Sequence, residues 1–529
     1  MAYLRKRSHP LVDLRENAFD ESKKAHNRIR KELALFKNEE YTDSGTWIDR
    51  LKRGVKRSLS PQSRAAVHRL VPVFTESMTN LNITPARKDA NEIEWDAAQE
   101  LEDHLKTTET IDGESEHLKD SVLHNQALGN CVSKIYWDDR SKVVRSATID
   151  PTRFAPAPTA SRSDFVGCSH VVHTTYKSQG HVKSFYPGAK TKANDKVRVD
   201  EIYLTGEKAL DMGLPEASQD DYIALAVLID DSLYRIWYDP FSYPSFPFAH
   251  WKGYSDIMLD GVATGFWGYG MGELLEPMQR LLDEFLSSYI WTSRNIATGR
   301  MVAKKGVLDQ DKLSNSSGEI ISINSESNEP IGNLIQMLNS PEPPTSLLNV
   351  IQMVKSAIEE ETPSLSDVFV GKSPGAGSSG RAISSLQSAA INQLSDNLRD
   401  MQHWRERRAR IKLAFIQQYN EYPDPILKRM GYNLAELTKD ARLLSFNISS
   451  LDIGSFPQTL QGKIQLLAAL ANFGFRLTPE KTIEFLNISE GYGLTDSDLI
   501  PIQDGQPIAG QGDGQEEDVS ASLPVDPLT

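Results

Sequence analysis

The feature that most constrains this chain is the order of elements predicted between Trp267 and Tyr419. The residues predict a helix, a polar insert, a second helix, a Gly/Ser-rich loop and a long helix. The first helix follows a glycine run and carries apolar residues at steps of three and four, which is typical of one buried helix face. These residues are Leu274, Leu275, Met278, Leu281, Leu282, Phe285, Leu286 and Tyr289. This order favours an elongated subunit that packs against neighbouring copies over a compact enzyme core.

The second helix is predicted to begin after Pro343 and Pro344, because proline suits the start of a helix and not its middle. Its apolar face is formed by Leu347, Ile351, Val354 and Ile358. The Gly/Ser-rich loop covers residues 371–380, and the long helix follows it. The apolar stripe of that helix is Ile383, Leu386, Ala390, Leu394, Leu398, Met401 and Trp404.

The composition indicates a protein without membrane spans. With 529 residues, the chain exceeds one ordinary domain, and two to four regions with separate cores are expected. No stretch approaches the roughly 18 apolar residues that a membrane-spanning helix needs. The basic N-terminus has no apolar segment after it, so no secretory signal is predicted. Cys131 and Cys168 are the cysteines of the chain, which argues against a disulfide framework and fits synthesis in a reducing cytoplasm.

Strand patterns dominate the middle of the chain. From Cys131 to about Trp251 the residues alternate with period two and are rich in β-branched and aromatic types. The run Tyr222–Ile229 is apolar throughout, which predicts a strand covered on both faces. We expect a β-rich subdomain of mixed or antiparallel strands, preceded by helices up to about Asn130. The segment "ARLLSFNISSL" is predicted to be a strand that returns to this sheet.

The ends of the chain have their own patterns. Residues 20–40 predict a basic amphipathic helix capped by Asp20 or Ser22, with an apolar edge of Ile29, Leu33 and Phe36. Helices are also predicted at about 460–472 and 478–486. The last residues, 503–529, are rich in glycine, proline and acids and are expected to be disordered.

Two glycine motifs in the loop resemble nucleotide-binding sequences. The segment 375–380 matches G-x-G-x-x-G, but the buried strand that this motif needs before it is missing, and Asp396 and Asp400 fall inside the following helix. The segment 371–373 resembles the end of a P-loop, but Ser366 stands where the first glycine belongs. A nucleotide-dependent enzyme that uses this loop is therefore the alternative interpretation and not the preferred one.

No other catalytic or metal-binding pattern emerges. Cys168, His170 and His173 are closely spaced donors, but a strand does not place all three on one face. No Ser/His/Asp or Cys/His spacing indicates a nucleophile. The sequence predicts a protein that is not an enzyme, with no cofactor and no metal.

Three segments resemble the portal proteins of tailed bacteriophages. They are "VRVDEIYLTG...YIALAVLIDDSLYRIWYDP...PFAHWKGY", "YGMGELLEPMQRLLDEF" and "IEEETPSLSDVFVGKSPGAGSSGRAISSLQSAA". The resemblance covers roughly residues 60–475 and rests on the order and spacing of elements. It implies an α+β, portal-like elongated subunit with a helical wing and stem, a β-rich wing subdomain, a small α/β clip and a helical crown. It also implies a ring, usually a dodecamer, at one vertex of a capsid.

The resemblance assigns a part to each region of the chain. In order, the regions are an N-terminal helical wing (1–130), a β-rich wing subdomain (131–265), stem helix 1 (266–297), the clip (298–341), stem helix 2 (342–362), the tunnel loop (363–380), the long wing helix and return strand (381–450), the crown (451–502) and the acidic tail (503–529).

The resemblance also implies site residues. The tunnel loop would touch DNA through Gly371, Lys372, Gly375, Gly377, Gly380 and Arg381. Lys304 and Lys305 of the clip would face the packaging motor or the adaptor. A basic cluster late in the long helix would contact a neighbouring subunit or DNA, with an exposed helix face as the alternative. The cluster consists of Arg399, Arg405, Arg407, Arg408 and Arg410.

The implied partners are other copies of the chain, double-stranded DNA bound without sequence preference, the terminase large subunit, the head-tail adaptor, and the major capsid and scaffolding proteins. The chain would act in DNA packaging and ejection within the virion. Its net charge of −14 is uneven, because residues 1–70 carry 17 Lys/Arg and 9 Asp/Glu, or +8, which leaves −22 on the rest. An acidic bulk suits a channel in which DNA slides better than a tight clamp, although it also serves solubility. Another helical virion or scaffold protein without a channel remains a further alternative.

Overall fold

A computed structural model of the chain describes residues 9–37, 60–76, 81–85, 92–160, 163–189, 191, 196–218, 223–240, 245–255, 265–297, 300–303, 330, 335–338, 345–362, 394–419 and 446–450. The chain divides into two units, Met1–Ser455 and Phe456–Thr529, and all described residues belong to the first. None of the described helices is both long enough and apolar enough to cross a membrane. The helices predicted at about 460–472 and 478–486, and the tail 503–529, lie outside the described residues.

The described part of the chain is a mixed α+β structure, as predicted. Its helices are α1 (Pro10–Lys37), α2 (Gln62–Glu76), α3 (Glu92–Asp112), α4 (Glu114–Leu128), α5 (Gln179–Phe185), α6 (Gly206–Asp211), α7 (Met271–Ala297), α9 (Thr345–Glu361) and α11 (Ser395–Gln418), with a 3-10 helix η1 (Pro151–Arg153). Its strands are β1 (Leu81–Pro85), β2 (Asn130–Asp138), β3 (Val143–Ile149), β4 (Phe154–Pro156), β5 (His170–Ser178), β6 (Lys196–Thr205), β7 (Ile223–Ile229), β8 (Ser232–Tyr238), β9 (Phe248–Lys252), β10 (Arg300–Ala303), β11 (Ile335–Leu338) and β12 (Phe446–Ser450).

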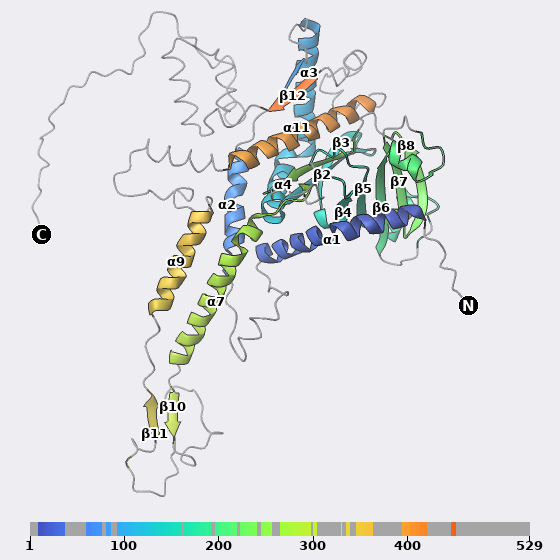
Figure 1. The fold of residues 1–529 in the computed structure, drawn as a ribbon. Helices are drawn as coiled ribbons and strands as arrows, with labels where there is room; N and C mark the ends of the chain where they lie inside the picture. Colours follow the sequence, from blue (N-terminus) through green and yellow to red (C-terminus); the bar gives the residue numbers. More distant parts are fainter. Residues whose placement is uncertain are drawn as a thin grey trace, which may run out of the picture. The chain divides into compact units, whose positions relative to one another are not determined.

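All strand pairs among the described residues are antiparallel. One sheet has the order β4-β5-β6-β7-β8, and a second has the order β3-β2-β9. β7 lies between β6 and β8, and side chains pack against both of its faces, which explains its apolar sequence as predicted. Figure 1 shows α1 lying along the five-stranded sheet and α11 running beside β2 and β3.

The first helix is longer than the sequence predicts. It begins at Pro10 and not at Asp20 or Ser22, and Ser22 is buried inside it. Leu11 and Ala18 pack on the five-stranded sheet together with Val172. Tertiary packing therefore extends the helix beyond the segment that its own capping signals suggest.

The strand β12 does not return to either large sheet. It pairs with β1 in a separate two-stranded sheet, with Ile448 opposite Ile83. This corrects two predictions, because residues 81–85 were expected to be helical and the segment around Phe446 was expected to join the β-rich subdomain. The side chains of both isoleucines are buried against the main core, so burial selects this pairing between segments more than 350 positions apart.

Candidate functional site

The helices α7 and α9 lie side by side, and the strand pair β10-β11 follows at the end where α7 stops and α9 starts (Figure 1). Both helices coincide with segments whose periodicity predicts them. On α9, Ile351, Val354 and Ile358 are buried in the main core, spaced as one helix face. On α7 the buried leucines are Leu275 and Leu282. The insert between the helices therefore begins and ends as an antiparallel strand pair.

The two helices also expose apolar side chains. Leu274 and Leu281 lie seven residues apart on one face of α7, and both are exposed. On α9, Leu348 is exposed and Met353 has 69% of its surface exposed. The predicted apolar face of α7 is therefore only partly buried within one subunit. Exposed apolar side chains therefore lie on both of these neighbouring helices.

The start of α7 is fixed by a junction of glycines. Gly129 has φ +67°, and a Cβ placed on it would lie 2.2 Å from the carbonyl carbon of Tyr269. A Cβ placed on Gly268 would lie 2.6 Å from the carbonyl oxygen of Gly129, and one placed on Gly270 would lie 2.8 Å from the carbonyl oxygen of Ala127. Gly253 donates to the carbonyl of Gly129 at 2.8 Å. Only glycine allows these three backbone segments to approach this closely.

The side chain of Asn130 forms hydrogen bonds with backbone groups of this junction. Its amide nitrogen donates to the carbonyls of Leu128 at 3.1 Å and Gly268 at 2.9 Å. Its side-chain oxygen accepts from the amide of Gly268 at 2.9 Å, and His250 lies 3.2 Å from the same oxygen. Because Asn130 is buried, these bonds compensate for its lost hydration and hold the residues before α7 against β2.

α1 is tied to the first turns of α7 by charged groups. Arg28 donates to the carbonyl of Gly268 at 2.8 Å and lies 3.5 Å from the carboxylate of Glu273. Lys31 pairs with Glu276 at 2.8 Å. The side chain of Glu32 accepts from the amide of Gly270 at 2.8 Å.

α7 in turn supports the start of α2. Asp283, which is fully buried, accepts from the amide of Ser60 at 2.6 Å. Gln279 accepts from the amide of Ser63 at 3.2 Å. The amide groups at a helix start have no partner within the helix, and a carboxylate there is favoured by the helix dipole. These hydrogen bonds hold α7 against the start of α2, at a point further along α7 than its contacts with α1.

α11 is anchored by a buried charge cluster. Both guanidinium nitrogens of Arg408 donate to Glu114, at 2.5 and 2.8 Å, and one of them also donates to Ser146. Lys412, which is fully buried, lies 3.2 Å from Glu114 and 3.4 Å from Asp112. Although burial opposes it, the cations next to Glu114 lower the pKa of this carboxyl from 4.5 to about 2. The cluster fastens α11 to the junction of α3 and α4.

The predicted basic cluster divides into two groups. Arg405 and Arg408 are buried inside the subunit, where burial lowers the pKa of Arg405 and Glu114 pairs with Arg408. Arg399 lies 3.9 Å from Asp396 at the surface, and Arg410 is exposed. The expected contact with DNA or a neighbouring subunit stays a prediction. Arg399 and Arg410 are the exposed members of the cluster, and Arg407 is half-buried.

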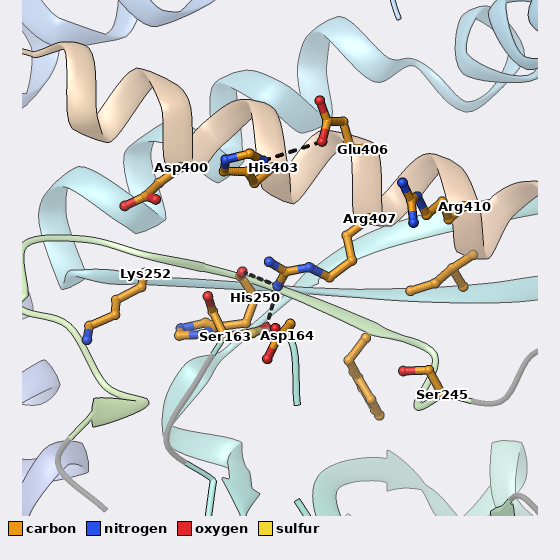
Figure 2. A pocket seen from close by; sticks show the side chains of 12 residues that line it. Ser163, Asp164, Ser245, His250, Lys252, Asp400, His403, Glu406, Arg407 and Arg410 are labelled. Atoms are coloured by element: carbon orange, nitrogen blue, oxygen red, sulfur yellow. Dashed lines mark hydrogen bonds and ion pairs between the residues drawn. The ribbon is translucent and has the colours of Figure 1, made fainter. Parts of the chain in front are cut away.

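Arg407 borders a cavity of about 540 Å³ between α11 and the loops beside β9. Figure 2 shows its guanidinium group pointing toward the backbone carbonyls of Ser163 and His250, to which it donates. Charges of both signs line this cavity, including Asp400 and Lys252. The mixed charge does not single out a ligand class.

The remaining predicted site residues lie outside the described residues. They are Lys304 and Lys305 of the insert and Gly371, Lys372, Gly375, Gly377, Gly380 and Arg381 of the loop. The glycine motifs of the nucleotide-binding alternative lie there as well. Within the part of the chain that the structure describes, no three donor side chains are grouped as a metal would need.

The buried anchor of α11 had a signal in the sequence that the prediction missed. Arg408 and Lys412 continue the apolar stripe of Leu398, Met401 and Trp404 at steps of three and four. Cations that continue a buried stripe indicate acidic partners inside the subunit. The glycine junction has no such signal, because its three segments come together only in the fold.

The model of the phage P22-like portal protein family matches residues 235–423, from β8 through α7, the insert, α9 and the loop to the end of α11. Over this stretch the chain is similar to the P22-like phage portal protein family. The match covers the helix pair, the insert and the long helix from which the resemblance was predicted. No curated protein matches this chain. Portal proteins are generally structural and form rings in the phage head.

Proposed function

We propose that this chain is the subunit of a portal ring whose channel carries double-stranded DNA during packaging and ejection. The observation that supports it best is the paired helices α7 and α9, joined by the β10-β11 insert, inside the stretch that matches the portal family. In this proposal α7 and α9 are the stem, residues 298–341 are the clip, and residues 363–380 are the tunnel loop.

The exposed apolar side chains of the stem support ring assembly. Leu274 and Leu281 of α7 and Leu348 and Met353 of α9 are uncovered in one subunit. In a closed ring each subunit presents two different patches, one to each neighbour. Burying these side chains against sister subunits would supply part of the association free energy, at about 25 cal/mol per Å² of apolar surface.

The ends of the ring would have different partners. The insert with Lys304 and Lys305 would dock the terminase large subunit during packaging and a head-tail adaptor afterwards. Gly371, Lys372, Gly375, Gly377, Gly380 and Arg381 would narrow the channel and touch DNA without reading its sequence. Scaffolding and major capsid proteins would contact the wing, and the channel itself would hydrolyse nothing.

Electron microscopy and light scattering of the purified chain test this function. We expect a closed ring with a central hole, and no binding of labelled ATP or NAD. Met353→Glu should shift assembly to at least about tenfold higher protein concentration, because it places a charge in the subunit interface. The control Val166→Glu makes the same kind of change at a residue that is 62% exposed in the loop before β5, and it should assemble normally. A monomer at every concentration would refute the proposal.

A further inference from the structure

α1 contacts the backbone immediately before α7 through the buried side chain of Glu32, and we call this contact the latch. The exposed surface of Glu32 is only 1%, and its carboxyl oxygen accepts from the amide of Gly270, immediately before α7. Gly272 also lies against Glu32, because a Cβ placed on it would lie 3.6 Å from the Cβ of Glu32, an ordinary van der Waals contact. A carboxyl that accepts from the amide before a helix satisfies a donor that the helix itself leaves open.

We infer that α1 is a protonation-sensitive latch on α7, in which the neutral Glu32 side chain holds the start of α7 and loss of its proton weakens the hold. The latch acts at the glycine junction, where the backbone of Gly268 and Gly270 is already packed tightly against residues 127–129. The N-terminal end of α7 is anchored at this junction. A shift of α1 at the junction would therefore change the direction of the α7 axis.

The electrostatics of the site support this inference. Burial raises the pKa of Glu32 from 4.5 to about 8, and the carboxylate of Glu273 raises it further, while the amide of Gly270 and the charge of Arg28 oppose the increase. Other titratable groups on elements that contact α1 include His124 and Asp120 of α4, His68 of α2, Glu276 and Asp283 of α7 and Asp150 beside η1. Burial lowers the pKa of His124, and the charges of Asp150 and Asp120 oppose this decrease.

The direction of the pH effect follows from the raised pKa. Between the ordinary pKa of 4.5 and about 8, the closed latch binds a proton that the open state does not bind. The latch is therefore strongest below about pH 4.5, weakens as pH rises, and reaches its weakest state above about pH 8. Neutral pH lies inside this range, so modest changes in pH alter the latch.

The consequence for the ring rests on the proposed function. If α7 is a stem helix, opening of the latch would free its wing end while its contacts with α9 persist. The latch itself is a property of one subunit, so it is measured without reference to the ring. Failure of the ring experiment would leave the latch standing, and failure of the latch experiment would leave the ring standing.

Hydrogen exchange of the full chain tests the latch. In the wild type, the protection of amides from Gly270 to Glu273 should fall by about tenfold per pH unit between pH 5 and 8, beyond the intrinsic increase of exchange with pH. Glu32→Gln keeps an oxygen that accepts from Gly270 but cannot ionise, so this excess loss should disappear. Equal pH dependence in the two proteins would overturn the inference.

Two further variants strengthen the test. Glu273→Gln removes a neighbour that raises the pKa of Glu32, so the loss of protection should level off at lower pH and be smaller in total than in the wild type. An unchanged pH profile in this variant would contradict the role of Glu32. Glu32→Cys combined with Gly272→Cys should form a disulfide, because the Cβ separation of 3.6 Å falls in the range of natural disulfides. Cys131 and Cys168 are buried and should not interfere. The oxidised pair should show protection that does not change with pH, whereas failure of the disulfide to form would contradict the contact itself.

Discussion

Replacing Glu114 by glutamine should destabilise the subunit by about 3 kcal/mol at pH 7. The carboxyl is buried and has a pKa of about 2 instead of 4.5, and each pKa unit corresponds to about 1.36 kcal/mol. Glutamine leaves Arg408 and Lys412 buried without a full counter-charge. Removal of one partner from a buried ion pair typically costs about 3 to 5 kcal/mol, which agrees with this magnitude.

Urea denaturation followed by circular dichroism measures this effect at protein concentrations too low for assembly. Because the pKa of Glu114 is depressed, its contribution is present above its ordinary pKa of 4.5 and is lost as pH falls toward 2. The difference between Glu114→Gln and the wild type should therefore shrink between pH 5 and pH 3. Asp396→Asn is the control, since this carboxyl at the start of α11 is 96% exposed and should change stability by less than about 0.5 kcal/mol. A loss below about 1 kcal/mol, or a difference that does not vary with pH, would refute the reasoning.

Gly129→Ala should cost about 4 kcal/mol or more in the free energy of unfolding, because its Cβ would meet the backbone of Tyr269 at 2.2 Å. Gly113 also has a positive φ but has open space around it, so Gly113→Ala should cost only about 1 to 2 kcal/mol in thermal or urea denaturation. Equal losses in the two variants would show that backbone strain, and not the contact with Tyr269, determines the cost at Gly129. Trp404→Ala should cost about 3 to 5 kcal/mol in the free energy of unfolding, because the ring of this α11 residue is fully buried. Trp95→Ala, at a ring that is 51% exposed, should cost much less, and a similar loss in both would contradict the assignment of the core.

The helices of the candidate stem were predictable because their signals are local. Pro343 and Pro344 mark the start of α9, and Ile351, Val354 and Ile358 repeat at helical steps on a single face. The apolar run of β7 likewise predicts its central place in a sheet. Each of these signals lies within one short segment, so no knowledge of distant residues is needed.

The basic residues of α11 were less informative about the structure, because the sequence does not distinguish an exposed arginine from one that is buried in an ion pair. Arg408 is buried against Glu114, whereas Arg410, two positions later, is exposed. The acidic partner lies 294 residues earlier in the chain. Only the packing of α11 on the α3–α4 junction decides which side of the helix is interior.

The sequence by itself determined which segments become helices and strands in the candidate stem and in the central sheet, because hydrophobic periodicity and proline positions act over a few residues. The tertiary structure alone decided that β12 pairs with β1, that α1 starts at Pro10, and that three backbone segments meet at Gly129. These outcomes depend on burial shared between segments far apart in the chain, and the free energy of such contacts exists only once the segments are together.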